Sequence, residues 1–117
     1  MIIAGICYKN ENRIHLDGQY LDPGPSQKLR NHSPTGFNWG YGGSGPAQLA
    51  LAILLDHFGE NIAQEYYQAF KWQFVATWPM GKPFEVEIDL DGWIFSQQKY
   101  QADRYASRYD FDLGVDI

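Results

Sequence analysis

The chain alternates between short segments with period-two hydrophobicity and longer segments with helical hydrophobicity. Residues 2–9 are rich in β-branched and aromatic side chains, which predicts a strand. Residues 10–12 predict a turn, and the polar–apolar alternation of residues 13–16 predicts a second strand that closes a hairpin. Residues 17 and 18 either end this second strand or extend the segment toward residue 21.

A further strand is predicted at residues 84–90, where the alternation is the most regular in the chain. Its apolar side chains are interleaved with Glu85, Glu87, Asp89 and Asp91. Period two with one apolar face is typical of a half-buried strand, and Gly92 is expected to end it.

Three segments predict helices. Residues 46–58 are apolar at most positions from 47 to 55, so this helix is expected to form the core and to end at Gly59. Residues 60–75 have one apolar face and predict a second helix, which follows so closely that the two form an antiparallel or angled pair. Residues 93–109 predict a third helix, followed by a short acidic end at 110–117.

The breaker-rich segment 22–26 predicts a turn within the domain, and residues 26–36 predict a polar loop with a short helical turn at 27–31. Together these elements predict an α+β fold in which a small antiparallel sheet packs on a helix pair. The length of 117 residues predicts a single domain, 1–117.

The charge and the cysteine content of the chain exclude some classes of binding partner and of covalent crosslink. With 14 acidic and 9 basic residues the net charge is −5, which disfavours direct binding to nucleic acid or to an anionic membrane. The single cysteine, Cys7, excludes an intramolecular disulfide and lies in an apolar run typical of a buried thiol. Residues 1–7 lack the features of a signal peptide, and the longest apolar run is too short for a membrane span, so a cytoplasmic protein is expected.

Residues 37–45, Phe-Asn-Trp-Gly-Tyr-Gly-Gly-Ser-Gly, combine glycine with aromatic side chains directly before the apolar helix. Ser44 or Gly45 suits the N-cap, and Pro46 suits the first turn. A glycine loop that opens a helix leaves N–H groups free at the positive end of the helix dipole, so it is a candidate anion cradle. The same pattern also serves simply to turn a chain into a buried helix. In both interpretations at least one of these glycines is expected to have positive φ.

This stretch is similar to the signature of a family of small bacterial and phage proteins classed only as a domain of unknown function. The shared pattern is F-x-W-G-Y-G-G-S-G-P-A-Q-L-A-L-A-I-L, preceded by His-Ser-Pro-Thr-Gly at residues 32–36 and followed by Tyr-Gln-x-Phe-Lys at residues 67–71. The resemblance covers roughly residues 20–80 and implies a phage or mobile-element setting, but it implies no activity.

We therefore expect a non-catalytic binding protein without a cofactor, which takes a small anionic, nucleotide-like ligand at the glycine loop. Loop N–H groups bind the anion, Trp39 or Tyr41 stacks on a base or sugar, and charged or polar side chains before the loop add contacts. The predicted ligand-binding residues are Arg30, His32, Trp39, Tyr41, Gly42, Gly43, Ser44 and Gly45.

Several catalytic and metal motifs match only in part. The spacing Gly40-x-Gly42-x-x-Gly45 resembles a dinucleotide or phosphate loop, but a second helix follows where a parallel strand is required, and no Lys-Ser/Thr pair follows the glycines. Ser44 lies between glycines as a hydrolase nucleophile does, yet Pro46 stands where the elbow needs glycine. The acids of 87–92 half-match a calcium loop, with Gln98 in place of the bidentate glutamate. A small hydrolase thus stays an alternative, and no metal is expected.

The acidic strand suggests another alternative. Alternate residues on a strand lie about 6.6–6.8 Å apart, so Glu85, Glu87, Asp89 and Asp91 would roughly imitate a row of phosphates. The chain would then inhibit nucleic-acid-binding host-defence machinery by occupying a basic protein surface. A solvated outer face of the sheet explains the same acids.

Overall fold

The computed structural model describes the backbone of residues 1–115 and the side chains of residues 1–104. The chain divides into two compact units. One spans Ile2–Glu87, and the other joins Met1 to the segment that begins at Ile88. The single domain inferred from length stays a prediction.

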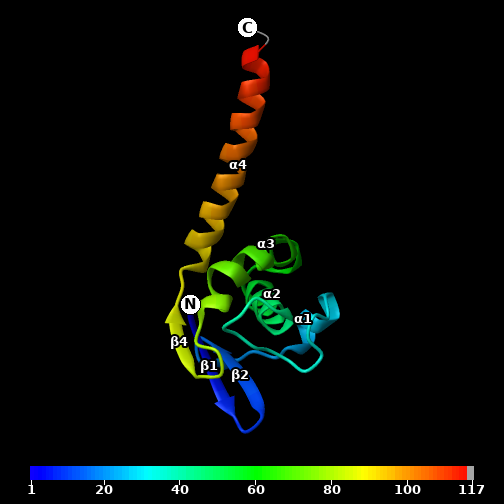
Figure 1. Ribbon diagram of the computed structural model, residues 1–117, viewed down its shortest axis with the longest axis vertical. Helices are drawn as coiled ribbons and strands as arrows, with labels where there is room; N and C mark the ends of the chain where they lie inside the picture. Colours follow the sequence, from blue (N-terminus) through cyan, green and yellow to red (C-terminus); the bar gives the residue numbers. More distant parts are fainter. Residues whose placement is uncertain (116–117) are drawn as a thin grey trace. The chain divides into compact units, whose positions relative to one another are not determined.

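The first unit contains one antiparallel sheet of four strands in the order β3-β2-β1-β4 (Figure 1). The strands are β1 (Ile2–Tyr8), β2 (Glu11–Leu16), β3 (Gln19–Tyr20) and β4 (Phe84–Glu87). The predicted hairpin is confirmed as β1 and β2, and the segment after it extends into β3. With the helices described below, this sheet confirms the predicted α+β class.

The register separates a buried face of the sheet from an exposed one. Ile3 lies between Leu16 and Val86, and Ile3 and Ile14 are fully buried. The alternate positions carry exposed apolar side chains, among them Ile2, Ile6 and Tyr8. The prediction of a buried thiol is wrong, because Cys7 lies near the end of β1, beyond the buried part of the strand, and is exposed.

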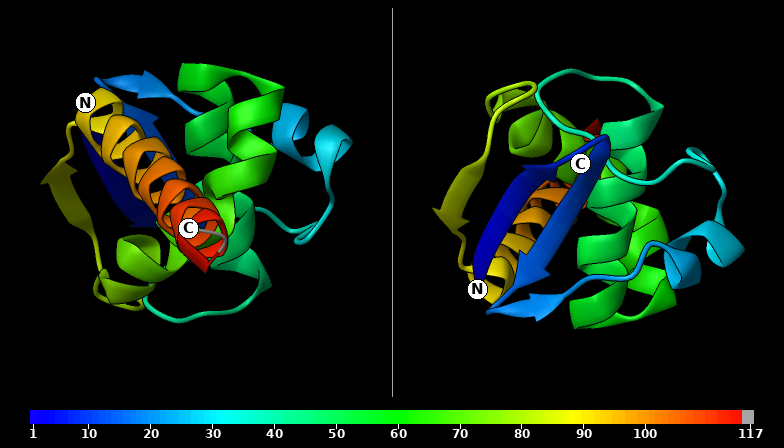
Figure 2. Two further views of the ribbon diagram at one scale, coloured as in Figure 1. Left: turned by 90° about the horizontal axis from the view of Figure 1, so that it is seen from above. Right: turned by 90° about the horizontal axis from the view of Figure 1, so that it is seen from below.

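The same unit contains three α-helices and a short 3-10 helix. They are α1 (Gly24–Leu29), α2 (Ser44–Phe58), α3 (Glu60–Gln73) and η1 (Val75–Thr77). Gly59 ends α2 with a φ of +90°, as predicted, and its N–H donates to the carbonyl of Leu55. Because this one residue separates α2 from α3, the two helices lie side by side in both views of Figure 2.

The core of the unit is α2, which is buried without interruption from Gly45 to Leu54. Leu51, Ile53 and Leu54 are fully buried, as predicted from a helix that is apolar on all sides. Both α1 and α3 contact α2 (Figure 1), so the helix is covered from more than one direction.

A turn predicted at residues 22–26 is instead the start of α1, and the helix begins three residues before the predicted helical turn. Proline is compatible with the first turn of a helix, where its missing N–H has no intrahelical partner. The carboxylate of Asp22 accepts a hydrogen bond from the N–H of Gly24 at 2.9 Å, and the Ser26 hydroxyl donates to the carbonyl of Pro23 at 2.8 Å. These local bonds stabilise a helical turn where composition alone indicated a break.

One buried amide connects α2 to the preceding loop. Gln48 is fully buried, and its Oε1 accepts hydrogen bonds from the N–H groups of His32 and Ser33 at 2.7 and 3.0 Å. Its Nε2 donates to the hydroxyl of Ser26 at 2.9 Å. Gln48 therefore bonds through its oxygen to the loop after α1 and through its nitrogen to α1 itself.

The second unit is dominated by α4 (Leu90–Val115). The strand predicted to Leu90 ends at Glu87, and Gly92 lies inside the helix. The reason is local: the carboxylate of Asp89 accepts a bond from the N–H of Gly92 at 3.0 Å, which favours a helix start over a continued strand. The helix predicted to end at residue 109 continues to Val115, and residues 116 and 117 of the predicted acidic end lie outside the described residues.

Two backbone hydrogen bonds connect Met1 to Ile88 within the second unit. The amino terminus of Met1 donates to the carbonyl of Ile88, and the N–H of Ile88 donates to the carbonyl of Met1, both at 2.9 Å. Over the described part of the chain, no helix has both the length and the apolar composition needed to span a membrane.

We predict that Leu51→Ala or Leu54→Ala lowers the free energy of unfolding by about 2–5 kcal/mol, because each leaves a cavity in a fully buried site. Leu55→Ala is the matched control. Leu55 is only half-buried, so its loss should be smaller. Urea denaturation measures all three, and a neutral Leu51→Ala would contradict the burial of α2.

A second prediction concerns Gln48→Leu, which leaves the N–H group of Ser33 without its acceptor and leaves that of His32 with only the Arg30 carbonyl at 3.2 Å. We expect a loss of about 1–3 kcal/mol of stability, the cost of a buried polar group without a partner. Gln64→Leu removes only an exposed bond from Arg30 and should change stability by less than about 0.5 kcal/mol. Equal losses for Gln48→Leu and Gln64→Leu in denaturant titrations would show that the buried amide does not stabilise the packing of the loop on α2.

Candidate functional site

The loop before α2 is anchored by a buried aromatic side chain. Trp39 is fully buried, and its Nε1 donates to the carbonyls of Pro79 and Lys82 at 2.9 and 3.0 Å. Its ring packs edge-on against Phe84, with centroids 4.9 Å apart. The predicted stacking of Trp39 on a ligand is therefore wrong, since no face of the ring is accessible.

The backbone conformation at Gly40 is one that glycine adopts more readily than any other residue. Its φ is +89°, and its N–H donates to the carbonyl of Val75 at 3.0 Å. A Cβ on Gly40 would lie 2.5 Å from the backbone of Met80. The prediction of a positive φ among these glycines is confirmed at Gly40, whereas Gly42, Gly43 and Gly45 have none.

A buried lysine fixes the next part of the loop from α3. The exposed fraction of Lys71 is only 6%, although a lysine is ordinarily a surface residue. Its ammonium group donates to the carbonyl of Gly42 at 3.1 Å and lies 4.4 Å from the centroid of the Trp72 ring. That ring covers Gly42 so closely that a Cβ there would lie 2.1 Å from it. The Trp72 ring of α3 therefore lies over Gly42, which is half-buried.

The N-terminus of α2 follows directly. Gly43 is the N-cap, with no side-chain cap, and its carbonyl accepts a hydrogen bond from the N–H of Ala47 at 3.1 Å. Within residues 1–104, the N–H groups of Gly43, Ser44 and Gly45 have no hydrogen-bond acceptor. The start of α2 thus presents unpaired donors at the positive end of its dipole, as the loop pattern predicted.

These donors border a polar cleft of about 330 Å³ between the β1–β2 hairpin and the start of α2. From the predicted site, Tyr41, Ser44 and Gly45 line this cleft. The other lining residues are mostly polar: Asn10, Glu11, Asn12, Ser33, Thr35, Gly36, Phe37 and Asn38. The sequence did not identify them, because the hairpin lies some 30 residues before the helix and only the fold brings the hairpin and the loop together at the start of α2.

Several polar groups of the cleft are already oriented. Asn12 donates through Nδ2 to the carbonyl of Phe37 at 3.1 Å, and Asn38 accepts the N–H of Trp39 at 2.9 Å. The one carboxylate in the lining, Glu11, pairs with Arg13 at 3.0 Å. This pairing reduces the repulsion that Glu11 would exert on an anion in the cleft.

Tyr41 covers part of the glycine loop. Its exposed fraction is 39%, and a Cβ on Gly43 would lie 2.5 Å from its ring. The Tyr41 hydroxyl lies near Gly45, 3.2 Å from where a Cβ would be. Gly43 and Gly45 are therefore small because the Tyr41 side chain and Asn38 occupy the adjacent space.

The two basic candidates point elsewhere. Arg30 donates through Nε to the Oε1 of Gln64 at 3.2 Å, and the Nε2 of His32 lies 2.9 Å from the hydroxyl of Tyr67. Both partners belong to α3, and neither Arg30 nor His32 lines the cleft. Their predicted contacts with a ligand at the loop are corrected accordingly.

The acidic row is divided between elements. Glu85 and Glu87 are exposed residues of β4, whereas Asp89 precedes α4 and Asp91 belongs to its first turn. The four carboxylates therefore do not form one strand face with regular spacing, because the strand ends at Glu87. The phosphate-like row behind the inhibitor alternative is not present in this form.

No histidine lines the cleft beside Ser44 among the side chains that the structure describes. His15 packs against Tyr20, His32 against Tyr67, and His57 lies near the other end of α2 against Phe58. Over the same residues, there is no group of three or more His, Cys, Asp or Glu side chains placed to hold a metal ion.

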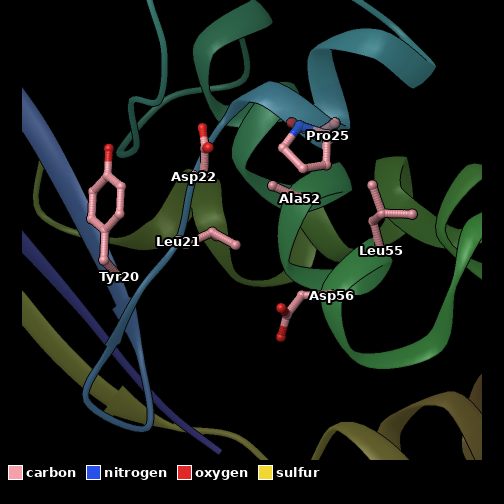
Figure 3. Close-up of a pocket in the computed structure, with 8 residues that line it drawn as sticks. Tyr20, Leu21, Asp22, Pro25, Ala52, Leu55 and Asp56 are labelled. Carbon is pink, nitrogen blue, oxygen red and sulfur yellow. The ribbon is translucent and has the colours of Figure 1, made fainter.

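A second cavity lies beside the C-terminal half of α2 (Figure 3). Its volume is about 220 Å³, and it is lined by residues of β3, α1 and α2 and of the segment between β3 and α1. Nothing in the sequence pattern pointed to it, since its lining residues are separated by some 30 positions and carry no motif.

Comparison with known protein families gives a match over most of the chain. A family model described as "Family of unknown function (DUF6166)" matches residues 6–102. The chain belongs to this family. The match extends well beyond the residues 20–80 of the signature, from residue 6 to residue 102. No curated protein and no solved structure matches the DUF6166 chain.

We predict that Gly40→Ala is more destabilising than Gly36→Ala. Both glycines have positive φ, which costs an alanine about 1–2 kcal/mol, but a Cβ on Gly36 meets nothing within 4 Å. At Gly40 the backbone of Met80 must also move, which should add about 1–3 kcal/mol. Thermal melts of the two variants compare these effects, and equal losses would argue against the close packing at Met80.

Proposed function

We propose that this protein is a non-catalytic binding protein that takes a small anionic, nucleotide-like ligand in the polar cleft at the start of α2. The observation that carries the proposal is the pair of unpaired N–H groups, on Ser44 and Gly45, in the wall of a cleft of about 330 Å³. Unpaired N–H groups at a helix N-terminus favour anions through both hydrogen bonding and the helix dipole.

The cleft contains further polar groups that could bind a ligand, besides the N–H groups of the helix end. Side-chain amides and hydroxyls from the hairpin and from the loop before α2 surround the same space. A pocket with convergent polar groups and a volume above about 300 Å³ is of the size that holds small organic ligands. Because the net charge is −5, attraction of an anion must come from these local donors and not from the protein's overall field.

Tyr41 takes the stacking role in this proposal. It lines the cleft, keeps 39% of its surface exposed, and lies next to the α2 N-terminus. A base or sugar ring placed against Tyr41 would leave an attached phosphate near Ser44. Aromatic stacking contributes about 1–3 kcal/mol per base, which suits a nucleotide-like ligand.

Binding is favoured over catalysis because Ser44 lacks a histidine neighbour in the cleft, and acyl transfer requires a base within hydrogen-bond reach of the nucleophile. The proposal therefore requires neither a cofactor nor a metal. From the resemblance of the loop signature, we further propose an accessory role in bacteria or their phages.

The test is Ser44→Asp, which separates binding from stability. A carboxylate in the first turn of α2 should stabilise the helix by about 0.3–1 kcal/mol. The same carboxylate should weaken an anionic ligand by about tenfold or more, since like charges about 4 Å apart near a surface repel by a few kcal/mol. Calorimetry with inorganic phosphate, mononucleotides and cyclic dinucleotides measures affinity, and thermal melts measure stability.

Asn61→Asp is the matched control, since it places the same charge in the first turn of α3, away from the cleft. It should leave affinity unchanged. The proposal fails if no member of the panel binds more tightly than about 1 mM, or if Ser44→Asp binds as tightly as the native chain.

A further inference from the structure

The second cavity, called here the α2 side pocket, lies away from the cleft and near the other end of α2. Its lining includes Leu21, Asp22, Ala52, Leu55 and Asp56. Ala52 and Asp56 lie some eight to twelve residues after Ser44, or roughly 12–18 Å along the helix axis. The side pocket is thus a separate site, and an inference about it does not depend on the proposed function of the cleft.

The interior of the side pocket is apolar. Leu21, Ala52 and Leu55 supply aliphatic surface (Figure 3). The one fully buried polar residue in the lining, Ser26, already donates to the carbonyl of Pro23 and accepts from Gln48. The interior therefore favours an aliphatic group over a polar one, because Ser26 has its hydrogen-bond partners within the protein.

Two carboxylates border this apolar interior. Asp22 comes from the segment before α1 and Asp56 from α2, and Figure 3 shows them on different sides of Leu21. One oxygen of Asp22 accepts the N–H of Gly24, which leaves the other oxygen available. Within residues 1–104, neither carboxylate has an ion-pair partner.

Asp56 occupies a position that is unfavourable for the isolated helix. It lies in the last turn of α2, which ends at Phe58, and the negative end of a helix dipole favours cations over carboxylates. A cation held beside Asp56 would remove this repulsion and would also interact with the dipole. The placement of Asp56 is therefore an independent observation that favours a positively charged ligand.

We propose that the α2 side pocket binds a primary alkylammonium group with a short aliphatic chain. The chain enters the apolar interior, and the ammonium group lies beside Asp56 at the border of the pocket. The volume of about 220 Å³ is below the roughly 300–1,000 Å³ of pockets for drug-sized ligands, so it fits one such chain.

The experiment is a titration of the full, isotope-labelled chain followed by the amide NMR signals of Leu21, Ala52 and Leu55. The probes are methyl-, propyl- and pentylammonium ions, with 1-pentanol as the neutral analogue. Affinity should rise by about fourfold for each methylene buried, the equivalent of about 0.8 kcal/mol. Pentanol should bind more weakly than pentylammonium.

Asp56→Asn tests the carboxylate without changing its shape. It should weaken pentylammonium by about three- to fivefold, the range of a partly exposed ion pair. Asp103→Asn, an exposed position on α4, removes the same charge outside the pocket and should have no effect. Equal binding of pentanol and pentylammonium, an unchanged affinity in Asp56→Asn, or the absence of any dependence on chain length would each overturn the proposal.

The ammonium group can come from a free amine or from a lysine side chain of another polypeptide. Nα-acetyl-lysine N-methylamide distinguishes these sources in the same titration. Binding at least as tight as that of pentylammonium indicates a lysine side chain. Binding weaker by about fivefold or more indicates a free amine, since the flanking amides of the lysine analogue would then be excluded.

Discussion

The complete burial of α2 is the constraint on which the rest of the first unit depends. Ten consecutive residues, Gly45–Leu54, are buried, so every face of the helix requires a cover. The cover cannot be wholly apolar, because the loop that follows α1 brings backbone N–H groups against the helix. Gln48 resolves this conflict: its amide accepts two of those N–H groups and donates to Ser26. One polar side chain thus allows a loop to pack on the central helix without leaving buried donors unsatisfied.

The same burial decides where ligands can reach the helix. The sides of α2 are occupied, so only the regions near its ends border open space. The N-terminal end, with its unpaired N–H groups, borders the polar cleft, and the C-terminal half borders the side pocket with Asp56. Because the dipole of a helix is positive at the start and negative at the end, the two proposals assign an anion to the first and a cation to the second.

The loop before α2 illustrates how glycines with the same spacing serve different purposes. Gly40 has the left-handed backbone and close contact with Met80 that only glycine accepts without strain. Gly42 lacks a side chain because the ring of Trp72 covers it, while Lys71 donates to its carbonyl. Gly43 and Gly45 leave room for Tyr41 and Asn38. Of these four glycines only Gly45 lines the cleft, so most of the apparent ligand loop is packed structure.

The sequence by itself determined the elements whose causes are local. The hairpin, the extent of α2 and its end at Gly59 follow from hydrophobic period and from cap residues a few positions apart. The tertiary structure decided the burial of those side chains whose hydrogen-bond partners lie far away in the sequence. The Lys71 ammonium group has the carbonyl of Gly42, in the loop before α2, as its acceptor, and Trp39 Nε1 has two carbonyls of the segment after η1. A hydrophobic pattern along the chain does not reveal such distant partners. The linings of both cavities were decided in the same way, because burial and pairing are properties of residues that meet in space, whereas a pattern along the chain records only neighbours in sequence.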